Sequence, residues 1–119
     1  LHGIDSPESD QPCFTEGRRW RCGQKAALAL DDLTRRKHIR CEVIDHYWKR
    51  PNAVCFMGEL NLNQWLVTNG WAVDSPRYSK GRYASEQQKA KAAKMNIWNS
   101  QFELPWIYRK KKRDKKKAK

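Results

Sequence analysis

The first eight residues contain the side chains best placed to do chemistry. The apolar residues Leu1 and Ile4 are typical of the end of a strand, and Pro7 interrupts the extended backbone. The segment therefore delivers two carboxylates, Asp5 and Glu8, three positions apart at a strand end. Such a pair can bind a metal ion or act as a general acid and base. The alternative is a solvated turn in which the first carboxylate caps the backbone that follows it.

The four cysteines fall into two plausible pairs, Cys13 with Cys22 and Cys41 with Cys55. The first pair brackets a short polar loop, and the second lies in two apolar segments that can face each other across a hairpin. Disulfides are favoured over zinc, because no CxxC or CxH spacing occurs and the three histidines are scattered. Disulfides would indicate an oxidising compartment. Buried free thiols remain the alternative.

Charge is distributed unevenly along the 119 residues, whose formal net charge is +12. Residues 109–119 hold nine Lys and Arg against one Asp, which leaves 16 basic and 12 acidic residues, a charge of +4, for residues 1–108. We expect one domain, 1–108, followed by a disordered basic tail. The tail could serve solubility, bind nucleic acid through its phosphates, or bind an anionic membrane surface.

The chain begins with Leu1 and shows neither a signal peptide nor an apolar run that could span a membrane. We therefore expect it to be processed, trimmed or cut from a longer chain.

The first half of the chain predicts a loop, a helix and a hairpin. Residues 9–22 show no clear period and predict a loop. Residues 23–33 predict a helix with one apolar stripe, formed by Ala26, Ala29, Leu30 and Leu33. Residues 39–44 and 53–57 predict antiparallel strands around a polar turn. Pairing the two cysteines of this hairpin also pairs Val43 with Ala53 and Ile39 with Met57.

The second half predicts two more helices. Residues 60–70 form the first, with Asn61 or Asn63 as its cap and Gly70 as its stop, and 71–73 can add a short strand. A polar loop over 74–81 leads to a helix from about 82 to 95. An apolar strap over 102–108 follows, and most of the six tryptophans are expected to pack in the core or the strap. This order predicts an α+β domain whose strands curl around a small barrel.

These pieces together resemble the staphylococcal nuclease-like (thermonuclease) family. Residues 1–8, LHGIDSPE, look like the family's R-L-x-G-I-D-[AST]-P-E signature without its arginine. WKRPNAV at 48–54 stands where the family has Y-G-R-x-x-A-x, and LNQWLVTNGWA at 62–72 is similar to L-N-x-x-L-V-x-x-G-x-A. Tyr83 and Glu86, followed by NIW at 96–98, match the last helix. The four motifs occur in family order from Leu1 to Trp98.

The resemblance implies an OB-fold, a five-stranded barrel with three helices, and calcium-dependent cleavage of DNA and RNA. Asp5 would be a calcium ligand, and the Ser6 carbonyl another. Glu8 would be the general base that orients water. Arg50 would hold the phosphate, with Lys49 as the alternative, because Lys49 replaces the family's glycine. The candidate contacts to DNA or RNA, preferably single-stranded, are Lys49, Tyr78, Lys110, Lys111 and Lys112.

The sequence departs from the family at its start. The first arginine would stand just before Leu1, and a further calcium-ligating Asp would lie upstream on a strand that this sequence lacks. A barrel without its first strands exposes sheet edges, which a dimer partner or a strand swap would cover, unless those strands lie outside this sequence. The cysteine pairs indicate an exported, secreted or periplasmic bacterial member.

Three functions compete at this point. The first is a sugar-nonspecific, calcium-dependent nuclease. The second is a nonenzymatic OB-like module that binds nucleic acid or protein. The third, suggested only by labels on exported bacterial relatives, is a role in extracellular polysaccharide production. The joint survival of Asp5, Glu8 and Arg50 favours the enzyme, because degenerate copies of the fold usually lose the carboxylates.

Overall fold

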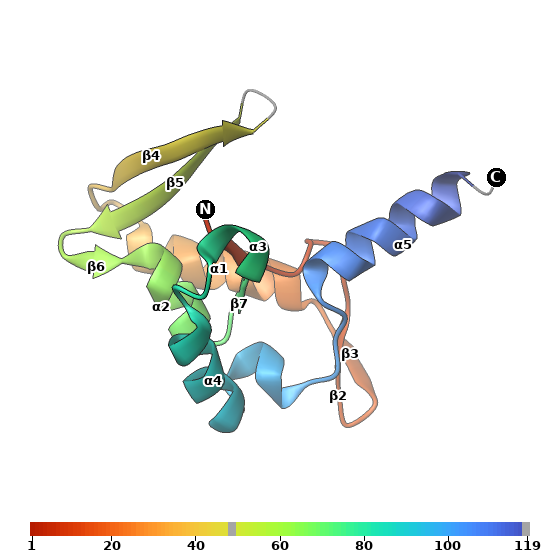
Figure 1. Ribbon diagram of the computed structural model, residues 1–119. Coiled ribbons are helices and arrows are strands. Elements are labelled where there is room, and N and C mark those ends of the chain that lie inside the picture. The colour runs from red at the N-terminus through yellow and green to blue at the C-terminus, as the bar shows by residue number, and fades with distance from the viewer. Residues whose placement is uncertain (48–49, 118–119) are drawn as a thin grey trace.

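The computed structural model describes residues 1–47 and 50–117, without the side chains of residues 47, 50 and 51. Its helices are α1 (Cys22–Thr34), α2 (Leu62–Thr68), α3 (Pro76–Ser79), α4 (Ala84–Ala92), the 3-10 helix η1 (Asn96–Asn99) and α5 (Pro105–Lys117). Its strands are β1 (Ile4–Asp5), β2 (Cys13–Thr15), β3 (Arg18–Trp20), β4 (Arg40–Tyr47), β5 (Arg50–Met57), β6 (Leu60–Asn61) and β7 (Val73–Asp74). The domain is thus α+β, and Figure 1 shows the β4–β5 hairpin and α5 projecting from it on different sides.

The strands form three separate antiparallel sheets, ordered β1–β7, β2–β3 and β4–β5–β6. The OB-fold barrel that the resemblance implies is not closed by the described strands. The physical reason is local: β1 has two residues and pairs only with β7, so no strand connects that sheet to the β4–β5 hairpin.

Helix α1 confirms the prediction for residues 23–33 and extends it by one residue at each end. All four members of the predicted stripe are buried or half-buried, whereas Leu28 on another face is exposed. The stripe packs inward because residues spaced by three and four share one helix face.

The predicted hairpin register is confirmed, since Cys41 lies opposite Cys55 and Val43 opposite Ala53. Strand β4 is not buried on either face, because residues 40–46 are all exposed. Val43 is 53% exposed and Ile44 51% exposed, because no described element covers this part of β4. Ile39 lies just before β4 and is also exposed.

The loop predicted for residues 9–22 is largely a second hairpin, β2–β3. Its connection, Glu16-Gly17, has positive φ at both residues, 52° and 77°. Such a two-residue turn matches the twist of antiparallel strands, and glycine adopts it at little cost. Both predicted disulfides are present, Cys13–Cys22 and Cys41–Cys55.

The later helices are shorter than predicted. Helix α2 begins after Asn61, whose side chain accepts from the backbone N–H of Gln64, as the capping prediction required. The loop predicted for 74–81 contains α3, which starts at Pro76 because proline fixes a helical φ at the first position. The helix predicted for 82–95 is observed as α4, with both ends trimmed.

Two small hydrophobic clusters form the core. One is built from Cys13, Cys22, Val73 and Ile97, and the other from Leu66, Val67, Ala72 and Tyr83. Five tryptophans (Trp20, Trp65, Trp71, Trp98 and Trp106) pack against these clusters, as predicted, and Trp71 contacts both. Trp48 lies outside the described residues.

The basic segment differs from its predicted disorder, because residues 105–117 form α5. Pro105 is buried, and Trp106 packs on the first cluster, which anchors the helix start. Lysine and arginine are good helix formers, and ion pairs with the body offset part of their mutual repulsion. None of the helices in the described part of the chain is long and apolar enough to cross a membrane.

Asn63 links three parts of the fold from a fully buried position. Its side-chain oxygen accepts from the Cys55 N–H at 3.1 Å, and its nitrogen donates to the carbonyls of His2 at 2.9 Å and Ala53 at 3.2 Å. The N-terminal segment is thereby held against β5 and the start of α2.

We predict that Asn63→Ala lowers the free energy of unfolding by about 2–4 kcal/mol, because it leaves buried donors and acceptors unpaired. Urea denaturation would measure it. Asn61→Ala is the control and should cost only about 1 kcal/mol, the usual value of a helix cap. Equal losses in the two variants would contradict the linking role of Asn63.

Candidate active site

The two carboxylates predicted to act together are close in space. Asp5 is the last residue of β1, and Glu8 follows the buried Pro7 in the connection to β2. Helix α1 fixes this connection, because a Cβ atom on Gly23 would lie 2.1 Å from the Glu8 carbonyl oxygen. Only glycine allows the backbone to approach the helix this closely. Gly23 therefore helps to place Glu8.

Both carboxylates bind the guanidinium of Arg109 on α5. Arg109 Nη1 donates to Asp5 Oδ1 at 3.0 Å and to Glu8 Oε1 at 2.9 Å, while Nη2 donates to Asp5 Oδ2 at 2.5 Å. The planar fork of arginine matches a carboxylate in this two-point manner. One guanidinium thus joins two acids more than 100 positions earlier in the chain.

The three side chains are only partly shielded from water. Relative exposure is 21% for Asp5, 41% for Glu8 and 36% for Arg109. The pKa of the Arg109 guanidinium is raised, chiefly by the hydrogen bond to Asp5 and further by the one to Glu8, although partial burial acts in the opposite direction. The cluster remains accessible, so a dissolved ion or substrate can reach it.

More cations of α5 surround Glu8. A cavity of about 280 Å³ is lined by Glu8 together with Arg109, Lys112, Arg113 and Lys116. Lys112 also pairs with Asp10, which lowers the pKa of the Asp10 carboxyl mainly through that hydrogen bond. A polyanion that entered this cavity would meet several positive charges beside one carboxylate.

Asp5 borders a different cavity, of about 190 Å³. Tyr78 of α3 and Asn52 of β5 line it, and the Tyr78 ring is 47% exposed with the guanidinium of Arg77 5.6 Å from its centroid. Asn52 follows Arg50 by two positions, so the start of β5 lies near Asp5. The predicted phosphate ligands are not tested, because Lys49 and the Arg50 side chain lie outside the described residues.

The remaining predicted site residues are not among the three side chains, Asp5, Glu8 and Arg109, that bind one another. Ser6 lies between the carboxylates and is half-buried. Lys110 is exposed on α5, and Lys111 forms an ion pair with Glu103 at 2.6 Å. We note that the sequence reasoning missed Arg109, since nothing in a run of nine basic residues distinguishes the one that folds back onto the acids.

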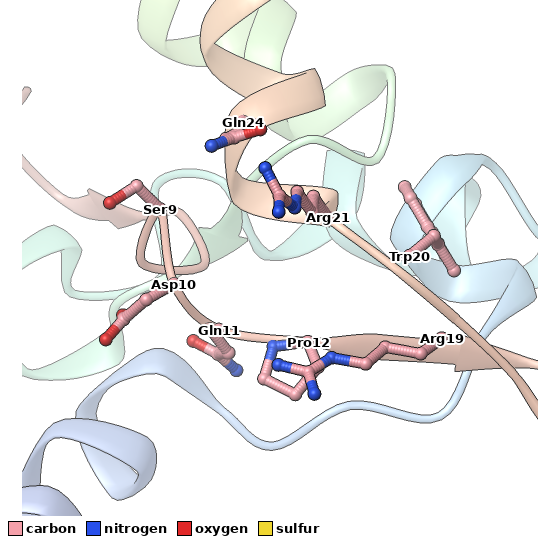
Figure 2. A pocket seen from close by; sticks show the side chains of 8 residues that line it. All are labelled: Ser9, Asp10, Gln11, Pro12, Arg19, Trp20, Arg21 and Gln24. Atoms are coloured by element: carbon pink, nitrogen blue, oxygen red, sulfur yellow. The ribbon is translucent and has the colours of Figure 1, made fainter.

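A polar cavity of about 340 Å³ lies next to this cluster (Figure 2). Figure 2 shows Ser9, Asp10 and Gln11 on one side and Arg19, Arg21 and Gln24 on the other. Asp10 joins it to the α5 cavity, because its carboxylate pairs with Lys112. The sequence reasoning did not predict this cavity, which exists only because the β2–β3 hairpin folds beside the start of α1.

Asp5 and Glu8 are ligands of the kind that a hard cation prefers, but they are only two side chains. Among the described residues, no group of three or more His, Cys, Asp and Glu side chains could hold a metal ion. Asp5 and Glu8 offer carboxylate oxygens, the ligands that Ca²⁺ prefers, and the remaining ligands of a calcium ion would have to be carbonyls, water or substrate.

Comparison with known proteins agrees with the motifs. A family model described as staphylococcal nuclease homologue matches residues 1–100. The chain belongs to this family. The succinoglycan biosynthesis protein ExoI of Rhizobium meliloti (strain 1021) is 41% identical over 108 residues, which are 87% of this chain and 56% of that protein. An uncharacterized 38.1 kDa protein of Capnoides sempervirens is 30% identical over 120 residues, 98% of this chain and 32% of that protein.

This chain therefore spans about half the length of one curated relative and about a third of the other. The family match ends at residue 100, before α5 begins at Pro105. Asp5 and Glu8 therefore lie inside the matched region, and the guanidinium that binds them comes from outside it.

We predict that Gly23→Ala lowers the free energy of unfolding by about 1–3 kcal/mol, because the added methyl group collides with the Glu8 carbonyl and forces the backbone to move. Chemical denaturation would measure the loss. Gln24→Ala, an exposed substitution at the next position of the same helix, should stay within about 0.5 kcal/mol. If Gly23→Ala matched this control, the close contact would not constrain Glu8.

Proposed function

We propose that the protein is a calcium-dependent, sugar-nonspecific nuclease that hydrolyses phosphodiester bonds of DNA or RNA. The observation that carries the proposal is the joint contact of Asp5 and Glu8 with one guanidinium, which places the two acids within reach of a common cation. Family membership supports the reaction class, because residues 1–100 match the staphylococcal nuclease homologues.

The side chains would divide the reaction between them. Asp5, with the Ser6 carbonyl, would hold calcium, which when bound stabilises negative charge on the phosphate oxygens. Glu8 would accept the proton of the attacking water. Arg50 would bind the phosphate and meet the charge that grows in the transition state, and Lys49 is the alternative residue for that contact.

The nucleic acid would lie along the basic side of α5. Lys110, Lys111 and Lys112 would contact phosphates, and the exposed ring of Tyr78 would stack on a base at the cavity beside Asp5. Single-stranded substrates suit this arrangement, because their bases are free to stack. The partners proposed are therefore DNA and RNA without sequence preference.

We also place the protein outside the cytoplasm, in a secreted or periplasmic setting. The support is the pair of disulfides, since intracellular thiols are normally kept reduced.

A second candidate function is noncatalytic, in extracellular polysaccharide production or nucleic-acid binding. Its support is the printed name of the 41% identical relative, a succinoglycan biosynthesis protein, and the ion pair that occupies both carboxylates. A cleavage assay separates the two functions, because only the nuclease turns over substrate.

We predict that Glu8→Gln lowers the rate of calcium-dependent cleavage of single-stranded DNA by about 10²–10⁴-fold, with little change in DNA affinity. Glutamine keeps the shape of the side chain but cannot take the water proton. Arg50→Ala should weaken both rate and affinity, while Lys49→Ala should be mild. Near-full activity of Glu8→Gln would reject Glu8 as the general base, whereas DNA binding without cleavage by the unmodified protein would favour the noncatalytic function.

We predict that replacing Lys110, Lys115 and Lys117 by glutamine flattens the salt dependence of DNA binding. These exposed lysines form no ion pair with the described carboxylates. Each lost phosphate contact should reduce the slope of log affinity against log salt by about 0.7 on single strands. The control is the triple glutamine variant of Lys25, Lys37 and Lys89, exposed elsewhere in the domain. An unchanged slope in the α5 variant would exclude Lys110, Lys115 and Lys117 from phosphate contact.

A further inference from the structure

The guanidinium of Arg109 fills the space that a cation shared by Asp5 and Glu8 would need. It takes both oxygens of Asp5 and one of Glu8. A divalent cation must bind the same lone pairs at about 2.3–2.6 Å, and its charge would repel the guanidinium. The two positive groups therefore compete for the oxygens that the two acids share with Arg109.

We propose that Arg109 is an autoinhibitory latch: it holds α5 on the carboxylates in the resting protein, and a divalent cation binds by displacing it. The inference rests on the proposed function for the identity of the cation site. It adds a regulatory role for a helix that lies beyond the family match.

The other contacts of α5 leave Arg109 as the main tie along the exposed part of the helix. Lys112–Asp10 and Lys111–Glu103 are pairs whose side chains are 42–69% exposed, and such pairs contribute little. The first turn is held separately by the buried Pro105 and by Trp106. Displacing one guanidinium would thus free the basic segment after residue 108 while the helix start stays attached.

The displacement would also change what α5 can bind. In the latched state Arg109 neutralises the acids and keeps the helix against them, whereas in the released state Arg109 itself becomes available to phosphates beside the exposed lysines of the helix. Because cation binding and α5 docking compete, each weakens the other by the same factor. The latch would therefore couple the arrival of the cation to release of the polyanion-binding helix.

Calcium titration of the full chain by isothermal calorimetry tests the latch without measuring catalysis. Arg109→Gln should bind Ca²⁺ about three- to tenfold more tightly than the unmodified chain, since the competing charge-assisted pair is gone. Arg109→Lys, which keeps the charge but not the fork, should fall between them. Arg113→Gln is the matched control: it removes one charge from the same cavity and should change the affinity less than twofold.

A second measurement follows α5 itself. Cleavage of the α5 lysines by endoproteinase Lys-C should become faster when Ca²⁺ is added to the unmodified chain, and should already be fast in Arg109→Gln without Ca²⁺. Circular dichroism would check that each variant is folded.

The outcomes separate the latch from the proposed function. The latch is overturned if Arg109→Gln binds Ca²⁺ no more tightly than the unmodified chain, if neither chain binds it, or if Ca²⁺ leaves α5 digestion unchanged. Tighter binding by Arg109→Gln with no cleavage of DNA by either chain would support the latch and reject the nuclease. Cleavage of DNA with equal Ca²⁺ affinities would support the nuclease and reject the latch.

Discussion

A strand of two residues cannot by itself hold the segment that carries Asp5 and Glu8, and this constraint shapes the rest of the structure. β1 pairs with β7 over only two positions. The segment therefore depends on side contacts: Asn63 binds the carbonyl of His2, the Ser75 N–H donates to the Gly3 carbonyl at 2.9 Å, and α1 meets the Glu8 carbonyl. The geometry of the acids thus comes from elements far away in sequence.

The contact of Arg109 with Asp5 and Glu8 is electrostatic, whereas the contacts just described involve uncharged groups. The segment places two negative charges side by side at the edge of the domain, and α5 brings a dense row of positive charges next to them. Neither arrangement is favourable alone, since like charges repel within each group. Pairing them lowers the repulsion on both sides, and the price is that the acids are occupied. In the latch that we propose, an outside cation exchanges with this arginine.

The small core explains why the disulfides and tryptophans matter. Two clusters of four buried residues each leave little apolar surface to oppose chain entropy. Cys13–Cys22 joins the β2–β3 hairpin to the start of α1, so the pair that restrains the connection after Glu8 also belongs to the core. Trp71 contacts both clusters and lies two positions before Val73, the residue of β7 that pairs with Asp5.

The sequence by itself determined the local elements, the cysteine pairs and the family. Helix α1 follows from its apolar spacing, the β4–β5 register from one alignment of Cys41 with Cys55, and the acids from a short motif. These signals come from neighbouring residues or from residues on either side of one turn. They can therefore be recognised in the sequence without knowledge of the tertiary structure. The Glu16-Gly17 pair is also a turn signal, but it is weak and lies inside a polar stretch. It was therefore not enough to predict the β2–β3 hairpin.

Only the tertiary structure decided that β4 stays exposed, how the strands group, and what binds the acids. Val43 lies opposite Ala53 as predicted and is nevertheless exposed, because burial depends on which element packs on the strand, and alternation along a strand does not specify that element. In the sequence, nothing distinguishes Arg109 from the other eight basic residues of 109–119. Its partners are set by where Pro105 and Trp106 fix the start of α5, because that position aims one guanidinium, and not its neighbours, at Asp5 and Glu8.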